Sequence, residues 1–317
     1  HEGRVVRAVC LFAGTLLDIK GTDDVKHSAR IHGAAHTMMV KKRPTRKARG
    51  LTKLEVMCLE VGAERAGSLC DQYASCFFAF CVHTRSRFRE ATTITNPLEI
   101  DRSPDGALAF IETSMQDHKS SNTGTLVKPP MPVVGHSVGI TGIDWGARLM
   151  QLREEMNLDD ADGLLTTPRG DGCGFIRKPI SAAEAVIWLQ EILVAGGFSA
   201  ESVSDLTTHS FKATLLAWCA KFGVKEGHRR LLGRHAKPKD RMMLEYSRDA
   251  MCGPLESLRE VLAGVADGSF DPDATRSGYK KRKTVEALAV LDPVPSTPPS
   301  PPPTADIPPT PPASPCM

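Results

Sequence analysis

Apolar residues recur at every third or fourth position in several stretches of the chain, a spacing that predicts helices with one buried face. The clearest stretch begins at Thr208, and its apolar positions are Phe211, Leu215, Trp218, Cys219 and Phe222. Four other stretches predict helices in the same way: Tyr73, Phe77, Phe80 and Cys81; Trp145, Leu149, Leu152 and Met156; Val186, Leu189 and Leu193; and Leu255, Leu258 and Leu262, ending near Gly264. Residues 5–17 form one more amphipathic stretch.

Two helix starts are marked by a hydroxyl residue followed three positions later by a glutamate. These capping boxes run from Thr52 to Glu55 and from Ser181 to Glu184. In such a box each side chain bonds the backbone N–H of the other residue, so two donors at the helix start are satisfied. A helix is therefore expected to follow each box.

Between the first helices and the later ones lies a region that predicts β-structure, residues 92–134. It contains an alternating run at residues 107–113, a turn at residues 103–106 (Ser-Pro-Asp-Gly) and an apolar segment at residues 131–134. The sequence therefore predicts a mostly α-helical α+β fold with one small antiparallel sheet.

The chain divides into three predicted parts. Residues 50–264 carry the periodic patterns and form the expected folded domain, preceded by residues 1–49 and followed by a basic and Pro-rich tail, residues 265–317. Residues 293–315 are too rich in proline to form a packed core and are expected to be extended and disordered. Their P-x-x-P pattern could engage an SH3 or WW domain, although a solvated tail is the more common case.

Charge and cysteine content narrow the function class. The 317-residue chain has 41% hydrophobic residues and a net charge of +3, but basic residues concentrate at positions 41–49 and 280–283. Such runs bind nucleic-acid phosphates, act as nuclear address signals or simply form solvated linkers, and the sequence leaves these alternatives open. Nine cysteines without a C-x-x-C pair or a secretion signal predict reduced thiols in the cytosol or nucleus, without structural zinc.

No apolar stretch of the sequence approaches the ~20 residues that a membrane-spanning helix requires.

Candidate chemistry gathers in the second half of the domain. His209 and Lys212 lie three residues apart in the first turn of the helix predicted at Thr208, so they are expected to share a face. Free backbone N–H groups and the positive end of the helix dipole favour an anion there. His235 and Tyr246 follow, and Arg87 and Glu90 stand earlier in an R-x-x-E box.

In this order the boxes resemble those of the tyrosine recombinases, or phage integrases, especially relatives carried by eukaryotic mobile elements. That family has an arginine in an R-x-x-E/D box, a hairpin lysine, an H-x-x-R box, a His or Trp shortly after Leu-Gly, and a tyrosine nucleophile. The matching residues here are Arg87, Lys119, His209, Lys212, His235 and Tyr246. Arg85 is a less favoured match than Arg87, and Lys128 competes with Lys119. The resemblance covers residues 51–262.

The resemblance implies the integrase catalytic-domain fold and DNA cleavage and rejoining through a 3′-phosphotyrosyl intermediate, without metal or nucleotide cofactor. Arg87, Lys212 and His235 would clamp the phosphate, His209 would be the base and Lys119 the acid. Tyr246 would be the nucleophile, since Tyr73 lies on an apolar helical face and Tyr279 in the basic tail.

The expected partners are double-stranded DNA and other copies of the chain, as a tetramer in synapsis that exchanges the C-terminal helix. Residues 1–49 are too short for the complete N-terminal helical domain of such recombinases and would be its last helix with the basic linker. A start at His1 rather than Met suggests a fragment or a processed protein. The expected location is the nucleus in a eukaryote and the cytoplasm otherwise.

Two departures from the family pattern define the alternative function. Lys212 replaces the usual arginine, so one fork-shaped contact to the phosphate is lost, and Arg234 is inserted between Gly233 and His235. The interval from His235 to Tyr246 is also slightly long. The alternative is a catalytically decayed DNA-binding protein with the recombinase fold, but retention of Tyr246 with both histidines favours the enzyme.

Overall fold

The computed structural model describes residues 9–10, 12–14, 17–27, 48–106, 108–115, 130–170, 174–234 and 248–275. Within this part of the chain the fold is mixed α+β and mainly helical. Its helices are α2 (Thr22–His27), α4 (Lys53–Arg65), α5 (Leu69–His83), α6 (Phe88–Thr92), α7 (Trp145–Glu155), α8 (Ala182–Ala195), α9 (Ala200–Val203), α10 (Thr208–Phe222), α11 (Glu226–Leu232) and α13 (Cys252–Ala266). Two short 3₁₀ helices are η1 (Asp160–Asp162) and η2 (Arg248–Met251).

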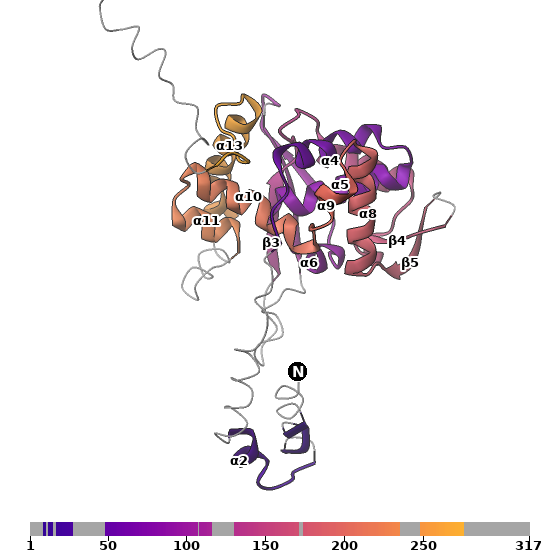
Figure 1. Cartoon of the computed structure of the whole chain (residues 1–317), viewed down its shortest axis with the longest axis vertical. Coiled ribbons are helices and arrows are strands. Elements are labelled where there is room, and N and C mark those ends of the chain that lie inside the picture. Colours follow the sequence, from indigo (N-terminus) through magenta and orange to yellow (C-terminus); the bar gives the residue numbers. More distant parts are fainter. Residues whose placement is uncertain are drawn as a thin grey trace, which may run out of the picture.

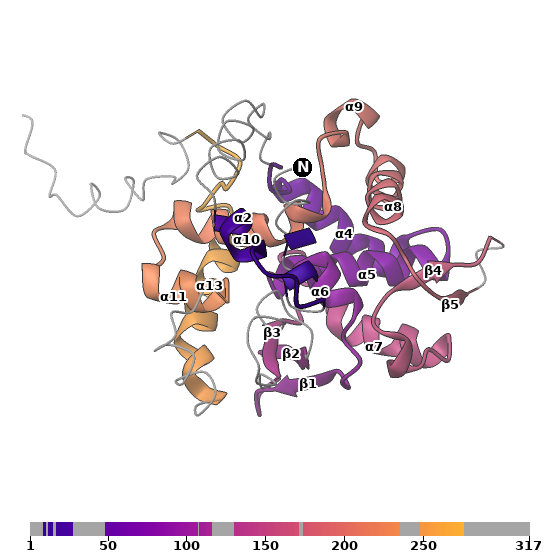
Figure 2. The same cartoon turned by 90° about the horizontal axis from the view of Figure 1, so that it is seen from below.

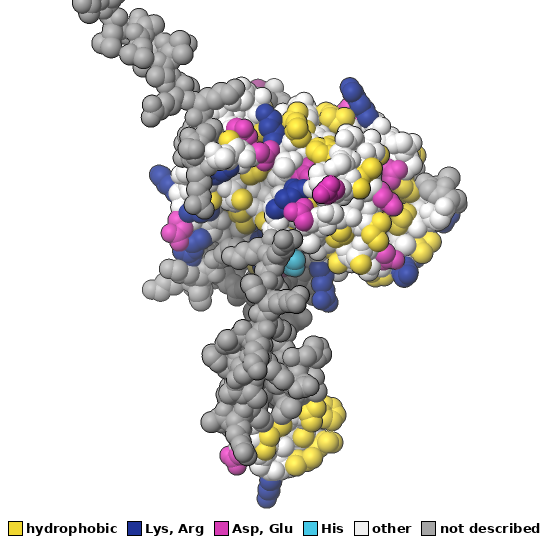
Figure 3. Space-filling model, in the orientation of Figure 1, with side chains coloured by type: hydrophobic (Ala, Val, Ile, Leu, Met, Phe, Trp, Pro, Cys, Tyr) yellow, Lys and Arg dark blue, Asp and Glu magenta, His cyan; other side chains and the backbone are white. Residues whose placement is uncertain are grey.

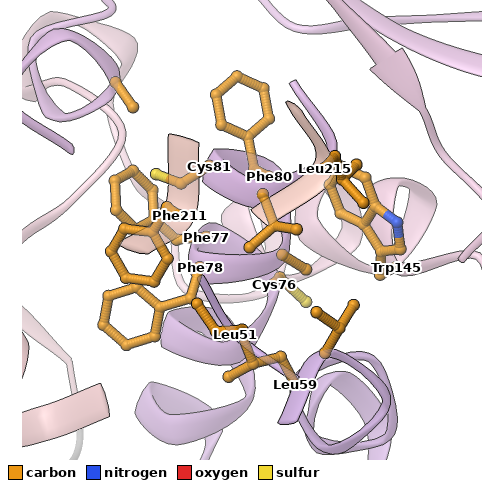
Figure 4. Packing of buried hydrophobic residues seen from close by; sticks show 14 of the residues in the cluster. Leu51, Leu59, Cys76, Phe77, Phe78, Phe80, Cys81, Trp145, Phe211 and Leu215 are labelled. Atoms are coloured by element: carbon orange, nitrogen blue, oxygen red, sulfur yellow. The ribbon is translucent and has the colours of Figure 1, made fainter. Parts of the chain in front are cut away.

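Helix α5 is the centre of the core. Its side chains are buried on every face after the first turn, and α4, α7, α8 and α10 pack around it. The rings of Phe78 and Phe211 stack with centroids 5.3 Å apart, which joins α5 to α10 (Figure 4). Helices α4, α5 and α8 lie on one side of the molecule and α10, α11 and α13 on the other, with β3 between them (Figure 1 and Figure 2).

Both predicted capping boxes are confirmed. The Thr52 side chain accepts from the backbone N–H of Glu55, whose carboxylate accepts from the N–H of Thr52, and Ser181 and Glu184 repeat the pattern at the start of α8. Loss of such a cap costs about 0.5–2 kcal/mol. These caps fix where α4 and α8 begin.

The predicted β region forms a three-stranded antiparallel sheet in the order β1 (Glu99–Arg102), β2 (Ala109–Met115), β3 (Met131–His136). The predicted turn closes β1 on β2 through a bond from Gly106 N to Ser103 O of 2.8 Å. Strand β3 packs against α13, and His136 Nε2 lies 3.1 Å from the carbonyl oxygen of Leu255.

A second hairpin is a correction to the prediction of one sheet. Strands β4 (Thr166–Pro168) and β5 (Phe175–Pro179) pair antiparallel, with a register irregularity between Thr166 and Thr167. Most of β5 is exposed, so its sequence lacks the alternation that marks a half-buried strand. Short exposed strands of this kind give no periodic signal.

The folded part extends beyond the predicted boundary at residue 264, as far as Thr275. Phe270 is buried with its ring centroid 5.1 Å from that of Phe222, and the ammonium of Lys221 donates to the Ala274 carbonyl at 2.7 Å. At the other end, Arg49 binds both carboxylate oxygens of Glu55 at 2.7 Å. The last residue of the first basic run is therefore attached to the domain.

Helix α13 packs onto its own domain. Leu255, Leu258 and Leu262 are buried, and the helix contacts α10, α11 and β3. Among the described helices, none is long and apolar enough to cross a membrane. On the face shown in Figure 3, Lys and Arg side chains are scattered among Asp and Glu. This face of the described domain therefore carries no concentrated patch of positive charge.

Candidate functional site

The segment from Thr84 to Arg87 connects α5 to α6; its first three residues are buried, and Arg87 is partly buried. Arg85 has a φ of 54°, in the left-handed region that costs a non-glycine residue of order ~1–3 kcal/mol. Its guanidinium is 1% exposed and donates to the carbonyls of His83, of Val134 at 2.9 Å and of Leu232 at 3.3 Å. Burial lowers the pKa of Arg85 to about 9. Arg85 thus joins α5, β3 and α11 through three carbonyls.

Arg87 is the first of the predicted site residues on this segment. It is the N-cap residue of α6, and its Nη1 donates to Glu90 Oε1 at 2.7 Å. The Arg87 side chain is 35% exposed, whereas that of Glu90 is 8% exposed. The R-x-x-E box therefore forms a real ion pair with the arginine on the open side, where a ligand could reach it.

Lys212 lies in the first turn of α10 and is 9% exposed. Within the described part of the chain its Nζ has no hydrogen-bond partner. Burial lowers the pKa of Lys212 to about 7, and the charges of Arg234, Arg87 and Arg85 act in the same direction, while Glu90 opposes them. A buried amine without an acceptor, beside three other cations, is an unfavourable arrangement unless a further anion joins it.

Arg234 is the fourth cation. It follows α11 with a φ of 54°, and its Nη2 donates to the Arg85 carbonyl at 2.9 Å and to Ser86 Oγ at 3.0 Å. Burial lowers its pKa to about 10, Glu90 raises it and Arg87 lowers it. Arg234 therefore lies against the segment that carries Arg85 and Arg87.

We call Arg85, Arg87, Lys212 and Arg234, with the carboxylate of Glu90, the cation cluster. Its members come from three separate parts of the chain: α6 with the segment before it, the N-terminal part of α10, and the residues just after α11. Buried charges in proteins are normally paired. Here Arg85 and Lys212 are buried and Arg87 and Arg234 are partly buried, and among the described residues Glu90 is the carboxylate that raises the pKa of Lys212 and Arg234. An anion with several acceptor oxygens, such as a phosphate group, has the charge and the acceptors that this arrangement lacks.

The structure brings together only some of the residues predicted from sequence. Arg87 and Lys212 join the cation cluster, but His209 is exposed at the start of α10. Three residues along a helix correspond to a separation of about 60°, so Lys212 can face the core while His209 sits at its edge. The prediction that both share one face is thus only partly right. Lys119 and its competitor Lys128, His235 and Tyr246 lie outside the described residues.

Sequence reasoning missed Arg234 as a site residue. The sequence pattern makes it an insertion between Gly233 and His235, where the family has no residue. The only local signal is a basic residue directly after an apolar Leu-Leu-Gly segment. Its place in the cluster depends on contacts with Arg85 and Ser86, about 150 positions away, which no local pattern reports.

Tyr73 is confirmed as a core residue. Its hydroxyl donates to the Leu164 carbonyl and accepts from Arg153 Nη1 at 2.8 Å, and burial raises its pKa to about 12. A phenol so enclosed has neither the exposure nor the acidity of a nucleophile.

Tyr73→Phe is expected to lower the free energy of unfolding by about 1–3 kcal/mol, because the buried Leu164 carbonyl and Arg153 Nη1 lose their hydrogen bonds to the Tyr73 hydroxyl. Urea denaturation measures the loss. A variant as stable as the native chain would contradict the assigned contacts.

No protein-family model matches the chain, and a search of curated proteins gives no match. Among the described residues, no group of three His, Cys, Asp or Glu side chains is arranged to hold a metal ion. Any assignment of function therefore rests on the chemistry of the cation cluster and on the order of the boxes.

Proposed function

We propose that the chain is a DNA strand transferase of the tyrosine recombinase type, which cleaves and rejoins DNA through a covalent bond to Tyr246. The observation that carries this proposal is the buried ammonium of Lys212, which has no hydrogen-bond partner among the described residues and lies near the charges of Arg87 and Arg234. The resemblance matches Arg87 and Lys212 to two cationic boxes far apart in sequence. Their proximity is what a phosphate clamp requires.

The cluster suits the charge that develops in phosphoryl transfer. A phosphodiester attacked by a hydroxyl gains negative charge on its non-bridging oxygens, and fixed cationic donors stabilise that state. A bound phosphate would also supply the acceptor that Lys212 Nζ lacks and would raise the pKa of Lys212 again. The cation cluster is thus unfavourable in the free protein and favourable around a phosphate.

The nucleophile follows from the sequence order. Tyr246 would attack phosphorus, the bond to the 5′ oxygen would break, and the resulting 3′-phosphotyrosyl link would keep the bond energy for rejoining. At neutral pH only about one tyrosine in a thousand is ionised, a handicap of roughly 4 kcal/mol. We assign His209 as the base that offsets it and Lys119 as the acid for the leaving 5′ oxygen.

The partners proposed are double-stranded DNA and, on paired sites, further copies of the chain up to a tetramer. Helix α13, now packed on its own domain, is the element that would be exchanged. A nuclear location would follow in a eukaryote. The first test is a suicide duplex with a nick beside the scissile phosphate, incubated with the protein and resolved on a denaturing gel.

The expected result is a covalent protein–DNA adduct, whose linked residue is identified as Tyr246 by peptide mapping. The alternative function is a non-catalytic DNA-binding protein. It is favoured by one observation, that lysine at position 212 is a point charge without the planar fork of arginine. DNA binding without any adduct, at two salt concentrations, would support that alternative.

A further inference from the structure

Arg234 is held in place by contacts that use only part of its guanidinium. Both described hydrogen bonds come from Nη2, one to the Arg85 carbonyl and one to Ser86 Oγ. Within the described part of the chain, Nε and Nη1 have no acceptor. An arginine carries five N–H donors in a rigid plane; contacts among the described residues use two of them, and those two bonds fix the direction of the other three.

The anchor of Arg234 is itself rigid. The carbonyl it binds belongs to Arg85, whose own side chain is fixed on three carbonyls of α5, β3 and α11. Ser86 in turn shares a hydrogen bond of 2.7 Å with Thr84. A cation positioned by such a network needs little reorganisation when a ligand arrives, which is the condition for effective electrostatic stabilisation.

Arg234 also lies beside the position where the family's second arginine is missing. The charge of Arg234 lowers the pKa of Lys212, and the carboxylate of Glu90 raises the pKa of both cations. Lysine offers three rotating donors on one atom, whereas a guanidinium offers directed donors on a plane. The inserted arginine therefore brings directed donors to the cluster that contains the substituted lysine.

We infer that Arg234 contacts the scissile phosphate and makes up for the guanidinium that is absent at position 212. This inference rests on the proposed function and adds a residue to its site. Arg234 is then a phosphate-binding residue, and Arg85 is a positioning residue that acts through it. Lys212 and Arg234 then bind the phosphate together, one with an ammonium group and the other with a guanidinium group.

The test measures phosphate binding separately from catalysis. The thermal midpoint of unfolding is followed against inorganic phosphate at constant ionic strength, kept with chloride, because a ligand that binds only the folded state raises the midpoint with its concentration. Arg234→Lys keeps the charge and loses the planar donors, and it is expected to weaken phosphate binding about tenfold. Arg89→Lys, at an exposed position two residues from Arg87, is the matched control and should change nothing.

The second part of the test places the guanidinium at position 212, where the family has its arginine. In the double variant Lys212→Arg with Arg234→Lys, phosphate affinity and the rate of adduct formation should recover to within about threefold of the native chain. If Arg234→Lys does not fold, Arg234→Gln retains a planar donor for the Arg85 carbonyl and serves in its place, with the same expected loss.

The outcomes separate the inference from the proposed function. Phosphate affinity unchanged in Arg234→Lys, or lost equally in Arg89→Lys, would overturn the role of Arg234 while leaving the adduct reaction intact. A lowered melting temperature with unchanged phosphate affinity would show that Arg234 is only structural, and would also overturn it. Loss of phosphate affinity in Arg234→Lys, rescued by Lys212→Arg, without any adduct in the native chain would refute the enzyme and support the phosphate contact.

Discussion

Tyr246→Phe is expected to abolish the covalent protein–DNA adduct and to leave affinity for duplex DNA nearly unchanged. The substitution removes one oxygen atom, and without it no bond to phosphorus can form. Affinity comes mainly from contacts with backbone phosphates, so it should persist and fall steeply with salt in both proteins. The suicide duplex on a denaturing gel measures the adduct, and a mobility shift at two salt concentrations measures binding.

Two matched controls use the other tyrosines. Tyr279→Phe should give as much adduct as the native chain, and Tyr73→Phe should do so once its lower stability is allowed for, because the Tyr73 hydroxyl is enclosed in the core. An adduct that survives in Tyr246→Phe and maps to another residue would mean that the nucleophile has been assigned wrongly.

Lys212→Met is expected to stabilise the free protein while lowering the rate of adduct formation about a hundredfold to a thousandfold. The methionine has a similar length and removes a buried amine that no described acceptor satisfies. Replacing buried charges by apolar groups of similar volume often stabilises a protein by about 1–4 kcal/mol. The rate of adduct formation falls because the transition state loses one cationic hydrogen-bond donor. A more stable and less active variant would identify Lys212 as a functional residue.

The pH dependence of stability separates this effect from general packing. The pKa of Lys212 is about 7 in the folded chain and 10.5 as the ordinary value, so between these the unfolded chain binds a proton that the folded chain does not. Stability contributed by this group therefore rises with pH across that window. Denaturation at pH 6, 8 and 10 should show the largest gain from Lys212→Met at pH 6.

Lys212→Arg is the control for charge. It keeps the cation and should give no such stabilisation at pH 6. Equal stability of Lys212→Met and the native chain at pH 6 would contradict the account of the Lys212 environment.

Local patterns predicted the helical framework well because they depend on nearby residues. Helix α10 runs from Thr208 to Phe222, as the apolar spacing indicated, and the capping boxes of α4 and α8 were confirmed. The turn at residues 103–106 and the return strand were also recovered. Each of these features is set by bonds or packing within a few positions along the chain, or by one buried face.

The site was predicted only in part because its geometry is tertiary. The sequence favours Arg87 over Arg85 as the phosphate-binding arginine. The structure agrees with this preference, because the Arg85 guanidinium already donates to three carbonyls. Arg234 had no family position to match, and only the fold brings it to Ser86. The opposite burial of His209 and Lys212 likewise depends on how α10 is rotated against α5, which the sequence spacing leaves open.

The most direct test of the phosphate clamp is the structure of the protein bound to a nicked duplex. The account predicts a non-bridging oxygen of the scissile phosphate within about 3 Å of both Lys212 Nζ and an Arg87 nitrogen. It also predicts the Tyr246 hydroxyl facing the phosphorus. A duplex bound across another face, with Lys212 Nζ still lacking an acceptor, would contradict the central claim.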